Sequence, residues 1–308
     1  MSEENETTTV KLGMGWLPDY PDFRDYTFEK NDLPARVKAV GEKDTVKTMI
    51  INLNLAEPVK VAIPATMDLR SWCSPIENQF NLGSCTAQAG VGLMEYFERR
   101  AFGRHVDASR LFLYKTTRNL LQWVGDTGAF LRTAMAAMVL FGVPPERYWL
   151  YIVPNYDMEP SAFLYSYAQS YQAIQYCRLD PFGVSNNVLL QRIKNCIAAN
   201  IPSMFGFTVF SSIRQASKDG KIPFPCKGEK IIAGHAVVAV GYDDKIKIKN
   251  NTCGKETTGA LLIRNSWGTG WGDKGYGWLP YEYVLKGLAR DWWILLKNEW
   301  VDTKKFGL

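Results

Sequence analysis

Two hydrophobic periods follow one another along the chain, and the change falls near residue 200. Before this point apolar residues recur every three to four positions, which predicts helices over residues 84–100, 109–122, 130–140 and 188–199. After it, runs rich in valine, isoleucine and aromatic residues predict strands over residues 203–210, 235–241, 260–265 and 277–279. A helix-rich part followed by a strand-rich part indicates an α+β protein.

The N-terminal region has a different pattern. Residues 1 to about 10 are polar and are expected to be disordered. Residues 15–26 place aromatics between prolines and charged residues with no helical or strand period, so we expect an extended arm that docks through residues 16–26 onto the body of the protein. Residues 59–63 alternate like a short strand, which Pro64 ends.

Composition and charge exclude several classes of function. With 308 residues and 46% hydrophobic content, the chain is long enough for two compact lobes or one large domain. The net charge of +5 comes from 36 basic and 31 acidic residues scattered along the chain, so no nucleic-acid partner is expected. There is no apolar run of about 18 residues, so no membrane span is expected.

The polar, acidic start of the chain lacks the basic and apolar regions of a signal peptide. Either the protein stays inside the cell, which is slightly favoured, or a leader has been removed. The six cysteines have no Cys-x-x-Cys pair, so we expect no metal site, no cofactor and no disulfide framework. Five of them are expected to be buried, reduced and structural: Cys73, Cys177, Cys196, Cys226 and Cys253.

The sixth cysteine, Cys85, falls at the start of the first predicted helix, just after Gly83 and Ser84. A thiol attacks only as a thiolate, and the positive end of a helix dipole lowers its pKa. The chain has only two histidines, and His235 could accept the thiol proton, while Asn265 could orient its ring. Gln79 and the backbone N–H of Cys85 could stabilise an oxyanion. Together these residues predict an acyl-transfer site.

Three segments resemble those of papain-like cysteine peptidases, and they occur in the same order. The first, residues 64–89, contains Gln79-Phe80-Asn81-Leu82-Gly83-Ser84-Cys85; the second is residues 234–242; the third, residues 264–276, contains Asn265-Ser266-Trp267-Gly268. The similarity covers roughly residues 64–285. It implies a helical left lobe and an antiparallel, β-barrel-like right lobe with the active-site cleft between them.

The resemblance also implies roles for individual residues. Cys85 would be the nucleophile, His235 the general acid and base, Asn265 the residue that orients it, and Gln79 the oxyanion donor. Trp267 would cover the His235–Asn265 hydrogen bond from water. Gly128 resembles the glycine that pairs with the substrate backbone. In this family specificity depends largely on the side chain before the scissile residue, and an apolar pocket for it would include Ala129, Phe130, Phe207 and Ala233.

The motifs also depart from the family pattern. Leu82 replaces a cysteine that normally forms a disulfide, and Thr86 replaces a tryptophan behind the nucleophile. Cys85 and His235 are 150 positions apart, at the upper end of the roughly 130–150 expected. His235 and Asn265 are 30 positions apart, which predicts a lengthened surface hairpin over residues 243–259.

The resemblance divides the chain at residue 64. Residues 1–63 would be a cleaved proregion or a retained arm, with intramolecular inhibition of the cleft as one outcome. Residues 64–308 would form the peptidase domain, with a helical lobe over about 75–199 and a β lobe over about 200–300.

The function predicted from the sequence is that of a cysteine endopeptidase, which acts on a peptide or protein substrate through an acyl-enzyme. If residues 1–63 are a cleaved proregion, the enzyme is made as a zymogen. Two alternatives stay open. One is a non-hydrolytic peptide-binding protein on a peptidase scaffold. The other is an acyl transferase or ligase, because water and amines compete for the same thioester.

Overall fold

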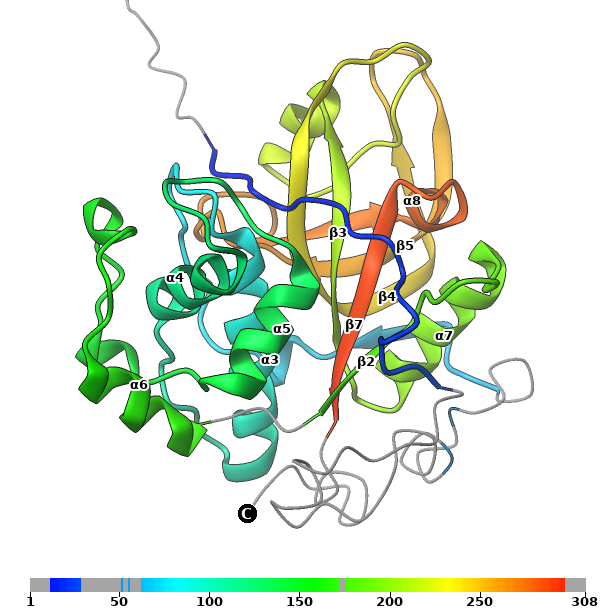
Figure 1. Cartoon of the computed structure of the whole chain (residues 1–308). Helices are drawn as coiled ribbons and strands as arrows, with labels where there is room; N and C mark the ends of the chain where they lie inside the picture. The colour runs from blue at the N-terminus through cyan, green and yellow to red at the C-terminus, as the bar shows by residue number, and fades with distance from the viewer. Residues whose placement is uncertain (1–11, 29–50, 52–54, 56–61, 172–174, 297–308) are drawn as a thin grey trace, which may run out of the picture.

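The computed structural model describes residues 12–28, 51, 55, 62–171 and 175–296. The predicted strand over residues 59–63 lies mostly outside these ranges. Residues 1–10, which we expect to be disordered, lie wholly outside them. The described part is a mixed α+β fold, in which a group of helices packs beside one antiparallel sheet (Figure 1). This confirms the predicted fold class.

The helical part is built around α3 (Cys85–Phe102), whose residues are buried almost without interruption as far as Phe97. Helices α4 (Arg110–Leu121) and α5 (Leu131–Leu140) pack against it, while α3 also touches the sheet through β4. Glycines allow these close approaches: a Cβ on Gly90 would lie 2.9 Å from Sδ of Met138. Helix α3 therefore carries its first residue, Cys85, to the boundary between helices and sheet.

The strands of the described residues form one sheet in the order β2-β7-β3-β4-β5-β6, with β1 added beside β4. Every pairing is antiparallel, and the sheet is not closed into a barrel. The expected right lobe is therefore an open sheet. The strands are β1 (Thr66–Asp68), β2 (Gln175–Arg178), β3 (Ser203–Phe210), β4 (Ile231–Lys249), β5 (Glu256–Arg264), β6 (Tyr276–Pro280) and β7 (Ala289–Leu296).

Two further α-helices, α7 (Asn186–Ala198) and α8 (Tyr281–Leu285), pack on each other and against the sheet, whereas α6 (Ala162–Ala168) lies at the outer edge of the helical part (Figure 1). The described ranges also contain short 3-10 helices: η1 (Arg70–Trp72), η2 (Glu146–Tyr148), η3 (Val153–Asn155), η4 (Gln169–Tyr171) and η5 (Ser211–Ser217).

The lengthened hairpin predicted over residues 243–259 is formed by the ends of β4 and β5, with a turn over residues 250–255. Cys253 in this turn forms a disulfide with Cys226. The expectation that both are reduced was wrong, because the hairpin brings together two cysteines that no sequence spacing relates. Cys73, Cys177 and Cys196 are buried thiols, as expected.

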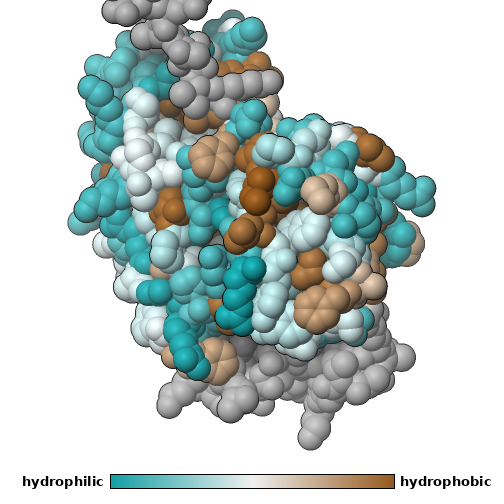
Figure 2. All heavy atoms as spheres, turned by 90° about the vertical axis from the view of Figure 1, so that its left-hand side faces the viewer, coloured by the Kyte–Doolittle hydropathy of each residue, from teal (hydrophilic) through white to brown (hydrophobic). Residues whose placement is uncertain are grey.

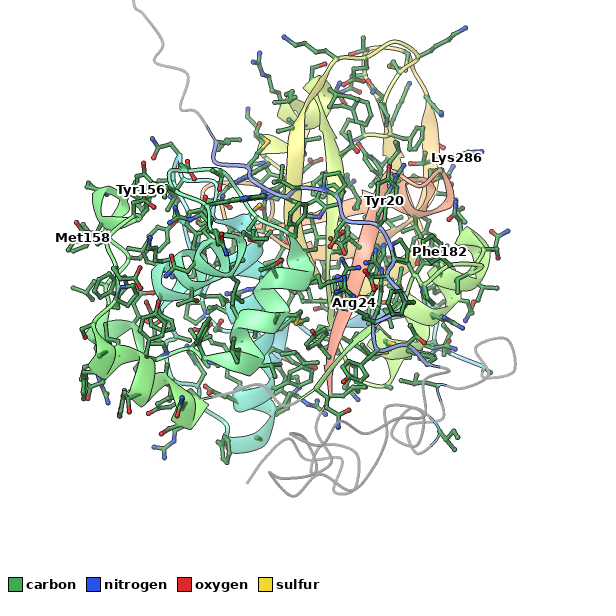
Figure 3. All side chains as sticks on the ribbon, in the orientation of Figure 1. Tyr20, Arg24, Tyr156, Met158, Phe182 and Lys286 are labelled. Atoms are coloured by element: carbon green, nitrogen blue, oxygen red, sulfur yellow. A yellow bond between two sulfur atoms is a disulfide. The ribbon has the colours of Figure 1, made fainter. Side chains whose placement is uncertain are left out.

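Residues 12–28 cross the front of the molecule as an extended arm, drawn in dark blue in Figure 1, from the helical part over β3 and β7 toward α7. Figure 3 labels Tyr20 and Arg24 along this course, with Phe182 near its far end. Trp16 and Phe28 belong to the hydrophobic core, being only 4% and 5% exposed. The arm is thus an integral part of the packing, as expected from its aromatics.

The outer face of the helical part, where α4 and α6 lie in Figure 1, is turned toward the viewer in Figure 2. Apolar and polar side chains are interspersed on it. Exposed apolar residues of this region of the chain include Tyr148, Leu150, Ile152, Met158 and Phe163. Within the described ranges no helix is long and apolar enough to span a bilayer.

Candidate active site

Cys85 is the first residue of α3, where the free backbone N–H groups and the positive end of the helix dipole lie. Ser84 is the N-cap, but its hydroxyl contacts Tyr151 Oη at 2.7 Å instead of capping the helix. The Cys85 side chain is fully buried. The helix therefore holds the thiol rigidly at the helix–sheet boundary.

His235 reaches the same boundary from the sheet. It lies on β4 beside Ala236, whose backbone N–H is close enough to Cys85 to favour the thiolate. Its Nε2 lies 2.8 Å from Oδ1 of Asn265, so this nitrogen donates the hydrogen bond and the other ring nitrogen, Nδ1, is the basic one. Nδ1 is buried and has no hydrogen-bond partner among the described residues.

Trp267 covers this pair. Its indole stacks on the imidazole of His235 with the ring centres 4.5 Å apart and the planes 19° from parallel. Trp271 in turn meets Trp267 edge-on at 5.3 Å. Both indoles are buried, so one face of the imidazole is packed against an apolar ring. The water-excluding role of Trp267 stays a prediction.

Gln79 is fully buried, and Ser266, the neighbour of Asn265, fixes its orientation. Ser266 Oγ donates to Oε1 of Gln79 at 2.5 Å, which turns the Nε2 amide group away from Ser266. Nε2 then donates to the carbonyl of Leu82 at 2.8 Å. The donor group of Gln79 is thus held beside the loop that leads into Cys85.

Asp126 connects this loop to the opposite wall of the site. Its carboxylate accepts the backbone N–H of Gly83 at 2.9 Å and the hydroxyl of Tyr114 at 2.6 Å. Tyr114 Oη also accepts the N–H of Gly128 at 3.1 Å. One carboxylate therefore ties the approach to Cys85 to the predicted substrate-binding loop.

The arm lies directly on the nucleophile. The N–H of Gly15 donates to Sγ of Cys85 at 3.2 Å. Two residues earlier, Gly13 donates its N–H to the Phe80 carbonyl at 2.8 Å, and its carbonyl accepts the indole N–H of Trp267 at 3.0 Å. The arm thus contacts the thiol and the tryptophan above the histidine at the same time.

Backbone hydrogen bonds hold the arm from both sides. Ala129 donates to the carbonyl of Gly15 at 2.8 Å and accepts from Leu17 at 3.1 Å, so the two segments pair in parallel. From the sheet side, the carbonyl of Gly234 accepts the N–H of Trp16 at 3.3 Å. The arm thus pairs with Ala129, the residue that follows Gly128. A Cβ on Gly128 would lie only 2.2 Å from the carbonyl oxygen of Gly15.

The other residues predicted to bind substrate lie at different depths. Ala129 is fully buried under the arm, whereas Ala233 is half-buried at the start of β4. Phe207 packs its ring edge-on to His235 and Tyr283, at 5.9 and 6.0 Å between ring centres. It therefore supports the histidine from within the sheet.

Burial shifts the pKa values of both Cys85 and His235. Burial raises the pKa of the Cys85 thiol to about 11, against the opposing effect of nearby backbone N–H groups. Burial also lowers the pKa of His235 to about 4, although its hydrogen bond to Asn265 acts in the opposite direction. The covered site therefore favours a neutral thiol and a neutral imidazole, which is the unreactive form.

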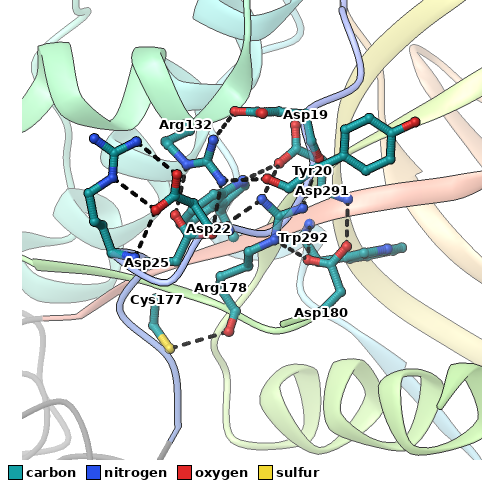
Figure 4. Close-up of polar contacts among 12 residues, drawn as sticks. Asp19, Tyr20, Asp22, Asp25, Arg132, Cys177, Arg178, Asp180, Asp291 and Trp292 are labelled. Carbon is teal, nitrogen blue, oxygen red and sulfur yellow. Dashed lines mark hydrogen bonds and ion pairs between the residues drawn. The ribbon is translucent and has the colours of Figure 1, made fainter. Parts of the chain in front are cut away.

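Beyond the site, the arm is anchored by charge (Figure 4). Arg132, on α5, pairs with the arm carboxylates of Asp19 and Asp25 and donates to the Tyr20 carbonyl at 2.7 Å. Arg178, on β2, lies 3.5 Å from Asp25 and donates to the Asp19 carbonyl at 3.0 Å. Two arginines of the body thus hold two aspartates of the arm.

Some contacts of the site had no clear signal in the sequence. Ser266 and Asp126 act through other residues, so their types alone do not reveal a role. Asp291, which lies below Trp16, belongs to a strand that was not predicted. Gly13 and Gly15 precede an aromatic run that did indicate docking, but not where it docks.

Comparisons with known proteins identify one family and several relatives. The family description "Papain family cysteine protease" matches residues 63–301. An uncharacterized peptidase C1-like protein of Acanthamoeba polyphaga mimivirus is 30% identical over 94% of this chain and 88% of its own length. The thiol protease aleurain of Arabidopsis thaliana is 25% identical over 92% of this chain and 72% of its own length.

Solved structures show the same fold. Xylellain, a cysteine protease from Xylella fastidiosa, superposes with a TM-score of 0.69 at 30% identity, covering 92% of this chain and 96% of that one. Digestive procathepsin L 3 of Tenebrio molitor superposes with a TM-score of 0.58 at 21% identity, over 78% and 72% of the two chains.

The fold is that of a papain-like cysteine peptidase. The chain belongs to the papain family of cysteine proteases.

Proposed function

We propose that this protein is a cysteine endopeptidase that uses Cys85 and His235, and that residues 12–28 keep it latent by occupying its substrate-binding cleft. One observation carries the proposal: three features meet at the same place. They are Cys85 at the N-terminus of α3, the His235–Asn265 hydrogen bond and the arm residue Gly15.

The chemistry follows from these groups. His235 Nδ1 takes the proton of Cys85, and the thiolate attacks a substrate carbonyl carbon, while Gln79 and the Cys85 N–H stabilise the oxyanion. The imidazolium then protonates the departing amine as the C–N bond breaks. Water deprotonated by His235 attacks the thioester, which releases the acid and restores the thiol.

Latency follows from what the arm presents to the thiol. The arm presents the backbone N–H of Gly15 to Sγ at 3.2 Å, whereas acylation needs a carbonyl carbon in that place. The arm also fills the backbone hydrogen bonds of Ala129 and Gly234 that an extended peptide would use. The arm therefore binds as an inhibitor whose own peptide bonds are out of register for attack.

We propose the corresponding division of the chain: residues 1–63 as the regulatory segment and residues 64–308 as the peptidase domain, with its helical lobe over about 75–199 and its β lobe over about 200–300. Strand β2 (Gln175–Arg178) and helix α7 (Asn186–Ala198) lie in the proposed helical lobe but contact the sheet. The link between the lobes thus runs along the sheet.

The test compares three full-length proteins: wild type, Trp16→Ala and Cys85→Ala. We expect little hydrolysis of a peptide library and slow labelling by an epoxide thiol inhibitor for the wild type. Trp16→Ala should raise both by tenfold or more, because the arm loses its buried anchor, and Cys85→Ala should abolish both. A Trp16→Ala protein that neither cleaves nor is labelled would contradict peptidase function.

Processing is tested by mass spectrometry of the wild type during incubation. A product that begins near residue 64 supports cleavage of residues 1–63, whereas a stable and active full-length enzyme contradicts the hypothesis that the protein is a zymogen. The alternative of an acyl transferase or ligase is separated by adding an amine nucleophile and identifying the products. A non-hydrolytic binding protein would bind peptides without turnover even after Trp16→Ala.

A further inference from the structure

The hydroxyl of Tyr151 contacts both of the segments that carry the expected oxyanion donors. Its Oη donates to the backbone carbonyl of Gln79 at 3.2 Å. It also lies 2.7 Å from Oγ of Ser84, the residue directly before Cys85. Because the tyrosine hydroxyl has one hydrogen and a carbonyl only accepts, the serine hydroxyl is the donor in the second contact. One hydroxyl therefore joins the backbone of Gln79 to the residue that precedes the Cys85 N–H.

The contact with Ser84 replaces a helix cap. A serine at the N-cap normally accepts an N–H of the first helical turn through its hydroxyl oxygen, but within the described residues Ser84 makes no such bond. Its fully buried side chain contacts Tyr151 instead. The first turn of α3 thus keeps N–H groups that Ser84 does not cap, beside Cys85, where negative charge would develop.

The contact with Gln79 supports a tight turn that leads into this helix. The Gln79 carbonyl also accepts the N–H of Leu82 at 3.2 Å, and Nε2 of Gln79 donates back to the Leu82 carbonyl at 2.8 Å. Phe80, inside the turn, has φ of 53°, which is uncommon for a residue other than glycine. Such strain is found mainly at functional positions, where the surroundings hold it in place. The Tyr151 hydroxyl is one of the groups that hold this turn.

Buried charges fix Tyr151 in turn. The guanidinium of Arg110 lies 4.5 Å from the centre of its ring, and the Tyr151 N–H donates to Oε1 of Glu146 at 3.3 Å. Arg110 and Glu146 pair at 2.5 Å and are only 6% and 8% exposed. Arg110 also pairs with Glu77, two positions before Gln79. Because buried charge pairs are costly to separate, this cluster holds the tyrosine ring in place.

We propose that Tyr151 is a positioning residue for the oxyanion, because its hydroxyl fixes the separation between the Gln79 amide and the Cys85 backbone N–H. The two donors belong to a loop and to a helix, which could otherwise shift relative to each other. Stabilisation of a tetrahedral intermediate depends on donors that are already in place, so a shift would weaken it while leaving the thiol intact. The inference rests on the proposed function, in which both donors bind the substrate carbonyl oxygen.

The main test adds Tyr151→Phe to full-length Trp16→Ala, the arm-released chain, and measures steady-state kinetics on one peptide that this chain cleaves. Phenylalanine keeps the ring under Arg110 and removes only the hydroxyl. We expect kcat to fall by about five- to tenfold, with KM within about twofold, because the lost contact matters once the oxyanion forms. Tyr156→Phe is the matched control: its ring also lies near an arginine, Arg118, at 5.4 Å, and kcat should be unchanged.

A second readout separates positioning from general structural damage and does not depend on hydrolysis. The aldehyde acetyl-Phe-glycinal forms a hemithioacetal, in which the Cys85 sulfur bonds to the aldehyde carbon and the thiol proton passes to the aldehyde oxygen. Iodoacetamide alkylates the same sulfur by displacing iodide and needs no oxyanion donor. In the Trp16→Ala chain, Tyr151→Phe should weaken aldehyde binding by about five- to tenfold in calorimetry. The alkylation rate at pH 7 should stay within about twofold.

Ser84→Ala breaks the same link from its other end and keeps the proposal testable if Tyr151→Phe does not fold. It should also lower kcat and aldehyde binding, and the two substitutions together should cost less than the product of their separate effects, because both remove one link. Unchanged kcat and aldehyde binding, an equal fall in alkylation, or fully multiplicative effects overturn the proposal. Aldehyde binding that depends on Tyr151, without any peptide cleavage, supports the positioning role and contradicts the peptidase function instead.

Discussion

The backbone N–H of Gly15 donates a hydrogen bond to Sγ of Cys85 across 3.2 Å, which joins an N-terminal arm to the residue that the sequence marks as the nucleophile. This contact places an amide hydrogen where a reacting carbonyl carbon would have to lie. It also shields the thiol from water, so geometry and protonation both oppose reaction.

Gly15→Ala should activate the full-length protein. A Cβ on Gly15 would lie 2.0 Å from the carbonyl oxygen of Gly83, a backbone atom that cannot move without disturbing the start of α3. We therefore expect the clash to displace the arm from the site, because this disturbs the structure less than a shift of the Gly83 backbone. We expect peptidase activity of the full-length chain to rise by about tenfold or more, measured as initial rates on an unselective peptide library.

Gly270→Ala is the control for this substitution, because a Cβ there meets nothing within 4 Å and the conformation is open to alanine. Its activity should equal that of the wild type. If Gly15→Ala also behaves like the wild type while remaining folded, the arm does not limit access to Cys85.

The pH dependence of thiol alkylation should report the covering of the site. In the covered chain burial raises the pKa of Cys85 to about 11, so the reactive thiolate is scarce at neutral pH and increases toward pH 11. Iodoacetamide labelling of the wild type should therefore be slow at pH 7 and accelerate with rising pH. In Gly15→Ala, water and His235 reach the thiol, and labelling should already be fast at pH 7.

The measurement is mass spectrometry of Cys85 labelling over pH 6 to 10, with buried Cys196 as an internal reference. Burial raises the pKa of Cys196, on α7, to about 12, so its labelling should be equally slow in both proteins. Identical Cys85 profiles in the wild type and Gly15→Ala would contradict shielding by the arm.

Local patterns were enough to predict the main elements that carry the site. The apolar period over residues 84–100 predicted a helix that starts at Cys85, and the observed α3 spans Cys85–Phe102. The strand predicted over residues 203–210 is β3. These elements have long runs of one period, so their own sequence determines their type.

Features that depend on contacts between distant segments could not be predicted in this way. In β7 (Ala289–Leu296) six consecutive residues are buried, without the alternation of apolar and polar positions that marks a half-buried strand. The hydrophobic pattern therefore does not distinguish a strand from a helix here. The Cys226–Cys253 disulfide depends on how a hairpin folds over η5 and its following loop. The left-handed Asp291 results from a register shift that only the paired strands reveal.

Ser266→Ala should lower kcat of an arm-released enzyme such as Gly15→Ala by roughly three- to tenfold, with little change in KM. The hydroxyl of Ser266 is the donor that orients Gln79, so its loss frees the Gln79 amide to rotate away from the oxyanion. Steady-state kinetics check this, with Ser266→Thr as the conservative variant that should restore part of kcat. A loss confined to thermal stability, with kcat unchanged, would show that Ser266 does not position Gln79.

Glu95→Gln should stabilise the protein at high pH but not at low pH. Glu95 is buried beside Ser74 and the N–H of Ala108, and burial raises its pKa to about 7 from an ordinary value of 4.5. A group whose pKa is higher in the folded than in the unfolded state favours folding below the unfolded pKa, and this contribution is lost as pH rises through the folded one. The shift corresponds to about 3 kcal/mol between pH 4.5 and 8, which the neutral glutamine would not lose.

The measurement for Glu95 is urea denaturation of the wild type and Glu95→Gln at pH 4.5 and pH 8, comparing the difference in unfolding free energy between the two proteins. The difference should move in favour of Glu95→Gln by about 2–3 kcal/mol from the lower to the higher pH. Glu256→Gln, at an exposed site beside Lys247, should show no such movement. A difference that is the same at both pH values would mean that Glu95 is ionised in the folded protein throughout this range, held so by the nearby Arg264.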